Sequence, residues 1–367
     1  MVFYLFVIFI SVSFLRLSNK TYGANRLFSN ILFFLGVFVP SIIGGLRNED
    51  VGTDMNTYGI QFFELACSSH DFWKYITDTH TPELAYYSLN YFCSAITKDI
   101  HFFLFCCEFI KMISVAYVCR KWRDKYNAYI FVLPYMLLFY CSGFSMMRQS
   151  LAICFCIIAF MYFIEKKYTP YIFNVIVAYE FHSSAIFFIA LSSLSLIRST
   201  RKRLLICVLG SIVMFALWQI ALPFLASTGL FKSGLAELYM DSGVTTDKSI
   251  ILSSSVLILL SSIAFLYKNG EYIENKRSLV LCYAIITLST AMMAANIEVA
   301  FRVCYYIFIF LIFYVPEMLK LTRSTIIRNV LSIFYISLFL LSFYLSASHG
   351  LAGALPYESE ALNLKYE

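Results

Sequence analysis

Long uninterrupted runs of apolar residues constrain this chain more than any other feature. The runs do not alternate with polar residues, and several are long enough to cross a bilayer as helices of about 20 residues. Two further apolar stretches are ambiguous: 84–97 is short, and 170–197 is too long for one span but short for two. We expect full spans near residues 1–15, 27–45, 101–119, 128–145, 147–164, 204–222, 250–267, 279–297, 301–319 and 330–347.

The composition is typical of an integral membrane protein. Hydrophobic residues make up 60% of the 367 residues and charged residues only 14%, whereas soluble domains carry about 25% charged residues. This excludes a soluble enzyme, a secreted disulfide scaffold, a disordered tail and a nucleic-acid binder. We predict an all-α, polytopic integral membrane protein with about 10–13 transmembrane helices, including short re-entrant or hairpin elements. The whole chain, 1–367, is expected to be a single membrane domain.

The distribution of lysine and arginine predicts which loops face the cytoplasm. Most of these residues lie in six short loops, which the positive-inside rule assigns to the cytoplasmic side. That assignment is consistent only if both ambiguous stretches return to the side from which they came. We therefore expect 170–197 to be a hairpin of two short helices with Glu180 and His182 near its tip. We expect 84–97 to lie at the outer interface, or to dip into the membrane and return to the same side. Residues 46–83 and 223–249 then form extracytoplasmic loops.

Three arginines lie away from the cytoplasmic clusters and share one predicted membrane depth. Arg47 follows the span 27–45, Arg148 lies in a turn between two spans, and Arg302 opens the span 301–319. An arginine at this depth is costly and is usually paired or functional, and its planar fork suits phosphate or carboxylate oxygens. Two explanations remain open. The arginines bind a shared anion, or they snorkel to headgroups and form structural ion pairs with Asp50, Asp54 or Glu298.

Other polar side chains are expected in the same outer layer. Histidine is the side chain that ordinarily exchanges protons near neutral pH, so His182 is a candidate for proton transfer. Glu108 and Lys111 are three positions apart inside a span, and we expect them to neutralise each other. No cysteine or histidine pair has metal-ligand spacing, so no metal or other cofactor is expected. The remaining polar residues of this layer are Asp54, Tyr58, Gln149, Glu180, Asn296 and Glu298.

Five segments resemble motifs of the EpsG family, the Wzy-like polymerases of bacterial exopolysaccharide and capsule. Residues 45–58, GLRNEDVGTDMNTY, resemble its R-x(3)-VGTDxxxY signature. Residues 147–152, MRQSLA, resemble its RQxLA turn, and residues 178–185, AYEFHSSA, its A-x-x-FHxSA segment. FRVCYY at 301–306 is similar to its R-x-x-x-Y-F segment, although Ile307 follows Tyr306 where the family has phenylalanine. LPY at 355–357 is similar to its closing PY.

The resemblance implies a GT-C-like membrane glycosyltransferase in the bacterial inner membrane. Such an enzyme polymerises undecaprenyl-pyrophosphate-linked oligosaccharide repeat units at the outer face, into capsule, exopolysaccharide or O-antigen. It implies membrane lipids, a chain-length regulator and a flippase as partners. A departing pyrophosphate needs fixed cations. The candidate substrate-binding residues are Arg47, Tyr58, Arg148, Gln149, Arg302 and Tyr305, and the candidate catalytic residues are His182, Asp54 and Glu180.

Several other functions compete with that of a polymerase. A flippase or exporter of lipid-linked oligosaccharides would also use basic residues against pyrophosphate, but transporters often contain inverted repeats and charges near the midplane. Here no repeat is found, and the unusual charges share one face, which favours single-sided chemistry. An O-antigen ligase and a membrane acyltransferase remain alternatives. A purely structural scaffold is disfavoured, because isolated polar residues in spans are costly.

Overall fold

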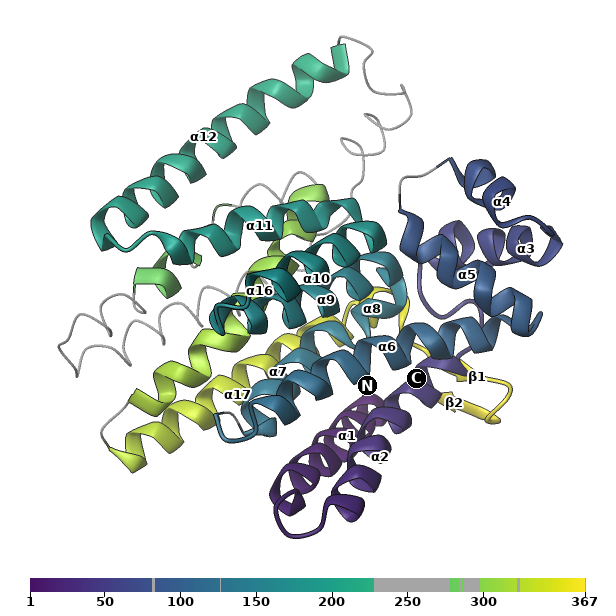
Figure 1. The fold of residues 1–367 in the computed structure, drawn as a ribbon, viewed down its shortest axis with the longest axis horizontal. Coiled ribbons are helices and arrows are strands. Elements are labelled where there is room, and N and C mark those ends of the chain that lie inside the picture. The colour runs from purple at the N-terminus through teal and green to yellow at the C-terminus, as the bar shows by residue number, and fades with distance from the viewer. Residues whose placement is uncertain are drawn as a thin grey trace. The chain divides into compact units, whose positions relative to one another are not determined.

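Helices dominate the computed structural model, which describes residues 1–80, 83–125, 127–227, 278–283, 285–286, 289, 298–321 and 324–366 (Figure 1). Five of its helices are long and apolar enough to cross a membrane: α1 (Val2–Thr21), α2 (Arg26–Gly45), α6 (Ile100–Lys121), α9 (Met147–Ile164) and α17 (Thr325–Ala347). The predicted all-α, multi-pass membrane fold is therefore confirmed. The predicted span 250–267 and most of 279–297 lie outside the described residues.

The chain divides into two compact units. The first comprises Met1–Ile186 together with Phe343–Glu367, and the second comprises Phe187–Ser342. The second unit contains most of α11 (Ile186–Ser193), with α12 (Thr200–Ser227) and α16 (Glu298–Leu321). Helix α12 continues to Ser227, so it includes the first residues of the predicted loop 223–249, and the rest of that loop lies outside the described residues. A single membrane domain over 1–367 stays a prediction.

Helix-on-helix packing builds the core of the first unit. Helix α1 packs against α2 and against α7 (Ala128–Phe139), while α6 packs against α2 and α9. Helix α10 (Tyr168–Phe181) packs along α9. The helices α1 and α2 approach closely at Gly36, where an added Cβ would lie 2.8 Å from Leu15 Cγ. The predicted span 128–145 is in fact broken, since α7 ends at Phe139 and the short helix α8 (Ser142–Ser145) follows.

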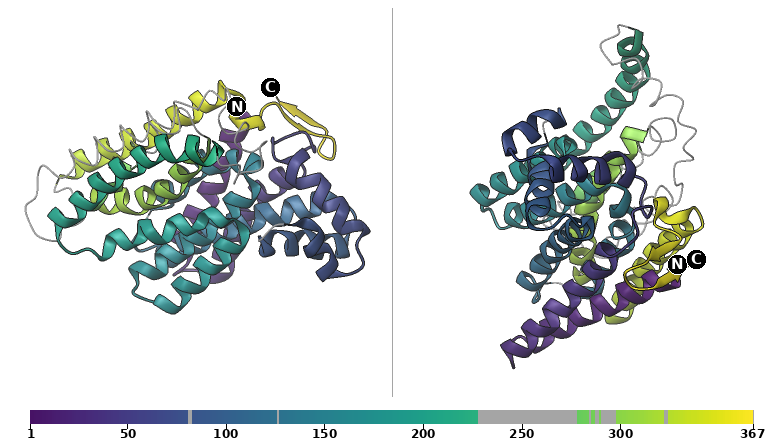
Figure 2. Two further views of the ribbon diagram at one scale, coloured as in Figure 1. Left: turned by 90° about the horizontal axis from the view of Figure 1, so that it is seen from above. Right: turned by 90° about the vertical axis from the view of Figure 1, so that its right-hand side faces the viewer.

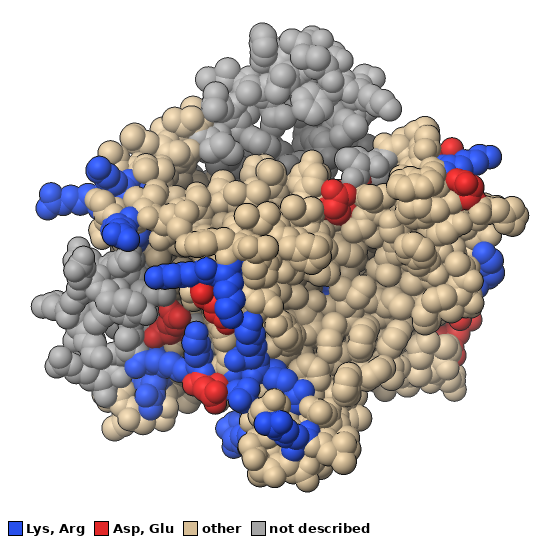
Figure 3. Space-filling view, viewed as in Figure 1, with Lys and Arg blue, Asp and Glu red and all other residues tan. Residues whose placement is uncertain are grey.

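Basic side chains gather at one end of the first unit. Arg26, Arg120 and Arg123 all place their guanidinium groups over the ring of Tyr22, which follows α1. Figure 3 shows the blue side chains concentrated around this end. Such a cluster is what the positive-inside rule predicts for the cytoplasmic end of these helices.

The predicted outer loop 46–83 contains short helices that the sequence analysis missed. A single-turn π-helix, η1 (Met55–Gly59), leads into α3 (Ile60–Ser68), and α4 (Phe72–Thr79) follows. The ambiguous stretch 84–97 is largely the helix α5 (Leu84–Ile96), and both α3 and α4 pack against it. The short apolar element was thus predicted at the correct place, and its position at the membrane interface stays a prediction.

The second ambiguous stretch is broken at His182, as predicted. Helix α10 ends at Phe181, His182 has an extended backbone, and a 3-10 turn at Ser183–Ala185 leads into α11. Two short helical segments therefore replace one long span. The hairpin path of the segment stays a prediction, because α11 lies mainly in the second unit.

The C-terminal segment returns to the end of α2 that carries Arg47. It contains a 3-10 turn (Gly350–Gly353) and an antiparallel hairpin of β1 (Tyr357–Ser359) and β2 (Leu364–Tyr366). Tyr357 Oη donates to the Ile43 carbonyl at 3.0 Å, and Gly52 N donates to the Gly353 carbonyl at 2.9 Å. Figure 2 shows both chain termini in this region. The C-terminal segment therefore packs directly on the end of α2 and on the loop that follows it. The membrane side on which they lie stays a prediction.

Candidate functional site

Two of the singled-out segments meet beside the C-terminal end of α2. Thr53 N donates to Ser145 Oγ at 2.9 Å, which joins the loop after Arg47 to the turn before Arg148. Gly52 has a φ of +109°, and an added Cβ there would lie 2.6 Å from the Phe144 carbonyl oxygen. Only glycine tolerates both this backbone conformation and this close approach. Gly52, the glycine of the VGTD sequence, therefore allows this loop to pack closely against the turn at Phe144.

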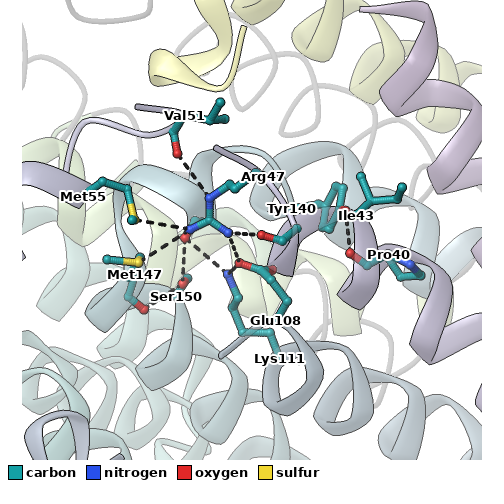
Figure 4. Close-up of polar contacts among 12 residues, drawn as sticks. Pro40, Ile43, Arg47, Val51, Met55, Glu108, Lys111, Tyr140, Met147 and Ser150 are labelled. Carbon is teal, nitrogen blue, oxygen red and sulfur yellow. Dashed lines mark hydrogen bonds and ion pairs between the residues drawn. The ribbon is translucent and has the colours of Figure 1, made fainter. Parts of the chain in front are cut away.

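A buried ionic network lies beneath this junction (Figure 4). The Arg47 side chain is 0% exposed, and its Nε donates to the Val51 carbonyl at 3.1 Å. Its Nη1 donates to the Gly44 carbonyl and lies 3.6 Å from Glu108 Oε1. The same carboxylate oxygen lies 2.5 Å from Lys111 Nζ, so the predicted neutralisation of Glu108 by Lys111 is confirmed. We call these three side chains the Arg47–Glu108–Lys111 network.

The network also holds the turn that carries Arg148. Lys111 Nζ donates to the Gly143 carbonyl at 3.2 Å, and Arg47 Nη2 lies 3.6 Å from Met147 Sδ. The Arg47 guanidinium also lies over the Phe144 ring, 4.4 Å from its centroid. These contacts connect α2, α6 and the start of α9. In this structure Arg47 pairs with Glu108, and with neither Asp50 nor Asp54, which the sequence analysis considered as partners.

A second, more accessible cluster forms around Glu83. Its Oε2 lies 2.5 Å from Arg148 Nη1, and its Oε1 lies 2.5 Å from His182 Nδ1. Ser183 N donates to the same Oε1 at 3.3 Å. The side chains of Glu83, Arg148 and His182 are 6%, 12% and 13% exposed. We call these three residues the Glu83–His182–Arg148 cluster.

The three residues of this cluster come from three different elements, and each residue lies at a helix end or directly beside one. Glu83 precedes the first residue of α5, Arg148 is the second residue of α9, and His182 occupies the break after α10. Backbone N–H groups at the start of a helix lack an intrahelical partner. The break at His182 therefore leaves the Ser183 N–H available to donate to Glu83 Oε1, beside the imidazole.

An aromatic ring lies on the other side of Arg148. The Arg148 guanidinium carbon lies 3.7 Å from the centroid of the Tyr58 ring, a cation–π contact. Tyr86 Oη donates to the Tyr58 carbonyl at 3.2 Å, which anchors the backbone beneath this ring. The Arg148 Nε atom is buried and has no hydrogen-bond partner among the described residues. The guanidinium is thus held between Glu83 and Tyr58.

The electrostatics of the cluster keep Glu83 ionised. Burial works to raise the pKa of Glu83, but the hydrogen bond from His182 and the charge of Arg148 outweigh it and hold that pKa below its usual value. An ionised carboxylate accepts the proton that His182 carries on Nδ1. The other ring nitrogen, Nε2, is then free to accept a proton from elsewhere.

The other predicted site residues lie at varied places. Asp54 is half-buried just before η1, Gln149 is buried beside Arg148, and Glu180 is half-buried in the last turn of α10. Arg302 and Tyr305 belong to α16 of the second unit. Tyr305 is buried, and the side chain of Arg302 lies outside the described residues. The functional roles of all these residues stay predictions.

Glu83 is the member of the cluster that the sequence analysis did not select. From the predicted outer loop 46–83, only Arg47, Asp54 and Tyr58 were selected as candidate site residues. A usable signal was present, because Glu83 directly precedes the short apolar stretch at the outer interface, the depth at which the unusual arginines were placed. Among the described residues, no group of three or more His, Cys, Asp or Glu side chains has the arrangement of a metal site.

Comparison with known proteins identifies the family. A family model described as the EpsG family matches residues 30–359. The amylovoran biosynthesis protein AmsC of Erwinia amylovora is 21% identical over 224 residues, which cover 57% of this chain and 56% of that relative. The aligned region thus spans little more than half of the relative's length, and no solved structure matches the chain. Because the family model covers most of the chain, this protein belongs to the EpsG family, as its five motif-like segments predicted.

Proposed function

We propose that this multi-pass protein polymerises oligosaccharide repeat units linked to undecaprenyl pyrophosphate, at the outer face of the bacterial inner membrane. The product would be exopolysaccharide, capsule or O-antigen. The family assignment and a relative named for amylovoran biosynthesis support a role in polysaccharide assembly. The single observation that carries the proposal is the Glu83–His182–Arg148 cluster, which combines a proton acceptor with a fixed cation.

The proposed reaction is a glycosyl transfer. A sugar hydroxyl of the incoming repeat unit attacks the anomeric carbon of the growing chain, and a new C–O bond forms. His182 Nε2 accepts the hydroxyl proton. The bond between the anomeric carbon and the phosphate oxygen breaks, and undecaprenyl pyrophosphate leaves with the electron pair. Negative charge therefore develops on the leaving oxygen while positive charge develops on the imidazole.

Each member of the cluster has a role in this scheme. Glu83 orients His182 through Nδ1 and stabilises the imidazolium that forms, as buried carboxylates do beside catalytic histidines. Arg148 stabilises the developing charge on the pyrophosphate, and its fixed position between Glu83 and Tyr58 removes the cost of reorganisation. Tyr58 offers an aromatic face and a hydroxyl near the same point.

The buried network supports a different role for Arg47 from the one first predicted. Its guanidinium is enclosed by protein groups and is 0% exposed. We propose that Arg47 is a positioning residue, because Arg47 and Lys111 together hold the turn from which Arg148 projects. A flippase that delivers the lipid-linked repeat unit and a chain-length regulator remain the proposed partners.

The proposal is tested in a strain that lacks the gene. The strain is complemented with wild type, His182→Ala, Arg148→Ala or the exposed control Glu64→Gln, and lipid-linked and surface glycans are separated on gels. We expect ladders from wild type and the control, and single repeat units at the outer face from the other two variants. Repeat units trapped on the cytoplasmic side would identify a flippase, and normal ladders in all variants would remove the cluster from the chemistry.

A further inference from the structure

We propose that the outward face of α4 and α5 lies in the outer interface of the bilayer and contacts lipid. This face is formed by Phe72 and Trp73 of α4 and by Phe92 and Ile96 of α5, which we call the aromatic patch. The proposal concerns membrane contact and stands independently of the proposed polymerase activity.

The patch is exposed and continuous across the two helices. Trp73 is 68% exposed, Phe92 59% and Ile96 71%. The Phe72 ring lies between the other aromatic rings, with centroids 5.0 Å from Trp73 and 5.7 Å from Phe92. Figure 3 shows a largely uncharged surface over α5, with charged side chains at its margin. Contiguous exposed apolar surface of this kind marks contact with a partner or a membrane.

Helix α5 carries large apolar side chains on its outward face as well as on its inward face. Its inward face buries Tyr86, Tyr87 and Cys93 together with Asn90 and Ser94, and its outward face carries Leu84, Phe92 and Ile96. A helix on the surface of a water-soluble domain usually has an apolar stripe toward the core and polar residues on the opposite face. The outward face of α5 therefore suits a hydrocarbon or interfacial environment.

The short connection between α5 and α6 indicates the membrane depth of this face. Helix α6 has 22 residues, about 33 Å, which matches the hydrocarbon core of about 30 Å. Helix α5 has 13 residues, about 20 Å, and is too short to cross. Only Thr97–Asp99 separate the two helices. Ile96 therefore lies within a few residues of the point at which α6 enters the core.

The chemistry of the patch favours the interface over the acyl interior. Tryptophan is enriched at headgroup depth, where its ring is half-solvated. Exposed Lys74 follows Trp73, and a lysine at this depth reaches lipid phosphate with its ammonium group. Phospholipid is therefore the occupant that fits this surface.

An interfacial α5 would also set the depth of the candidate site. Glu83 directly precedes α5, so a helix lying along the interface holds this carboxylate at headgroup level. This consequence rests on the proposed function, in which the pyrophosphate of a lipid-linked substrate lies at that level.

Fluorescence quenching of Trp73 tests the proposal. The chain has three tryptophans, so Trp122→Phe with Trp218→Phe leaves Trp73 alone. The purified variant is placed in phosphatidylcholine bilayers whose acyl chains carry bromine either near the headgroup or near the bilayer centre. We expect loss of Trp73 emission in both, with the larger loss for bromine near the headgroup. The matched control replaces Trp73 by Phe and introduces Phe34→Trp on the exposed face of α2, where central bromine should quench more strongly.

Several outcomes would overturn the proposal. One is unchanged emission in brominated lipid together with strong quenching by aqueous iodide. Another is protection from iodide by added polysaccharide without quenching by lipid, which would assign the patch to glycan. If the double variant is not recovered, the emission of Trp73 is obtained by subtracting the spectrum of Trp73→Phe from that of wild type, with the same expectations.

Discussion

Glu83 Oε1 lies 2.5 Å from His182 Nδ1, although the two residues are 99 positions apart in the chain. This contact fixes which imidazole nitrogen carries a proton and leaves the other available as a base. The same carboxylate binds Arg148 through its second oxygen. One buried carboxylate therefore positions both the proposed base and the proposed cation.

Replacing Glu83 by Gln should leave a folded protein with little polymerase activity. The amide keeps the size of the side chain but removes the charge that orients His182 and stabilises its protonated form. We expect a loss of about 10²- to 10⁴-fold, the usual contribution of a positioned general base. Polymerisation rates are compared with those of Glu64→Gln, the same change at an exposed position of α3. Equal rates for the two variants would contradict the assigned role of Glu83.

Replacing Arg148 by Lys tests the need for the guanidinium fork. Lysine keeps the charge but loses the planar group that bonds Glu83 and stacks on Tyr58. We expect activity to fall by about 10²-fold or more, the scale for the loss of one preorganised donor. Arg201→Lys, at an exposed position in α12, is the matched control and should retain full activity. Full activity of the Arg148 variant would instead indicate a structural or headgroup-binding arginine.

The Arg47–Glu108–Lys111 network should govern stability. Glu108→Gln leaves Arg47 and Lys111 as two buried cations without their shared carboxylate. Removing one partner of a buried ion pair costs about 3–5 kcal/mol, so the thermal midpoint in detergent should drop by several degrees. Adding Lys111→Met to Glu108→Gln removes one stranded cation and should recover part of the loss. A midpoint like that of wild type for the single variant would show that the network contributes little.

Gly52→Ala should disrupt the junction between the VGTD loop and the turn before Arg148. The positive φ and the nearby Phe144 carbonyl both oppose a Cβ at this position. Strained backbone of this kind costs about 1–3 kcal/mol, and displacement of the turn should also lower activity. Gly23→Ala is the matched control, because nothing lies within 4 Å of its added Cβ. Similar thermal midpoints and activities for the two variants would exclude the proposed constraint.

Glu165, which directly follows the C-terminal end of α9, should give a pH-dependent contribution to stability. Burial works to raise its pKa, but hydrogen bonds from Lys167 and Trp122 and the charge of Lys121 outweigh it and lower the pKa to about 2. A carboxyl with a depressed pKa stabilises the fold above its unfolded pKa and loses that effect as pH falls through its folded pKa. The difference in thermal midpoint between wild type and Glu165→Gln should therefore be full at pH above about 4.5 and shrink toward pH 2. A difference that stays constant over this range would contradict the interpretation.

Much of the fold was predictable because membrane spans leave a strong signal in sequence. The long apolar runs correspond to helices such as α1, α2 and α6, and the unusual stretch around His182 is broken where its polar residues predicted. The short helices of the outer loop were missed, since they lack the length that makes a span recognisable. A local signal did exist for α4, because Asp71 caps its first turn by accepting from Lys74 N at 2.6 Å.

The partners of the polar residues were harder to predict, because tertiary contacts select them. Glu108 and Lys111 were paired correctly from their spacing on one helix, but nothing local indicates that Arg47 joins them. Likewise, no feature of the sequence connects Glu83 with His182. Arg148 and His182 were predicted to lie at a similar membrane depth, but only the folded chain shows that a common carboxylate joins them.

The most direct test of the central claim uses purified protein in lipid nanodiscs with repeat units linked to undecaprenyl pyrophosphate. Chain growth and release of undecaprenyl pyrophosphate are measured together for wild type, Glu83→Gln and Glu64→Gln. The account predicts that wild type and Glu64→Gln release one carrier lipid for each new glycosidic linkage, and that Glu83→Gln does neither at a comparable rate. Chain growth by Glu83→Gln at the wild-type rate would contradict the claim that the Glu83–His182–Arg148 cluster performs the transfer.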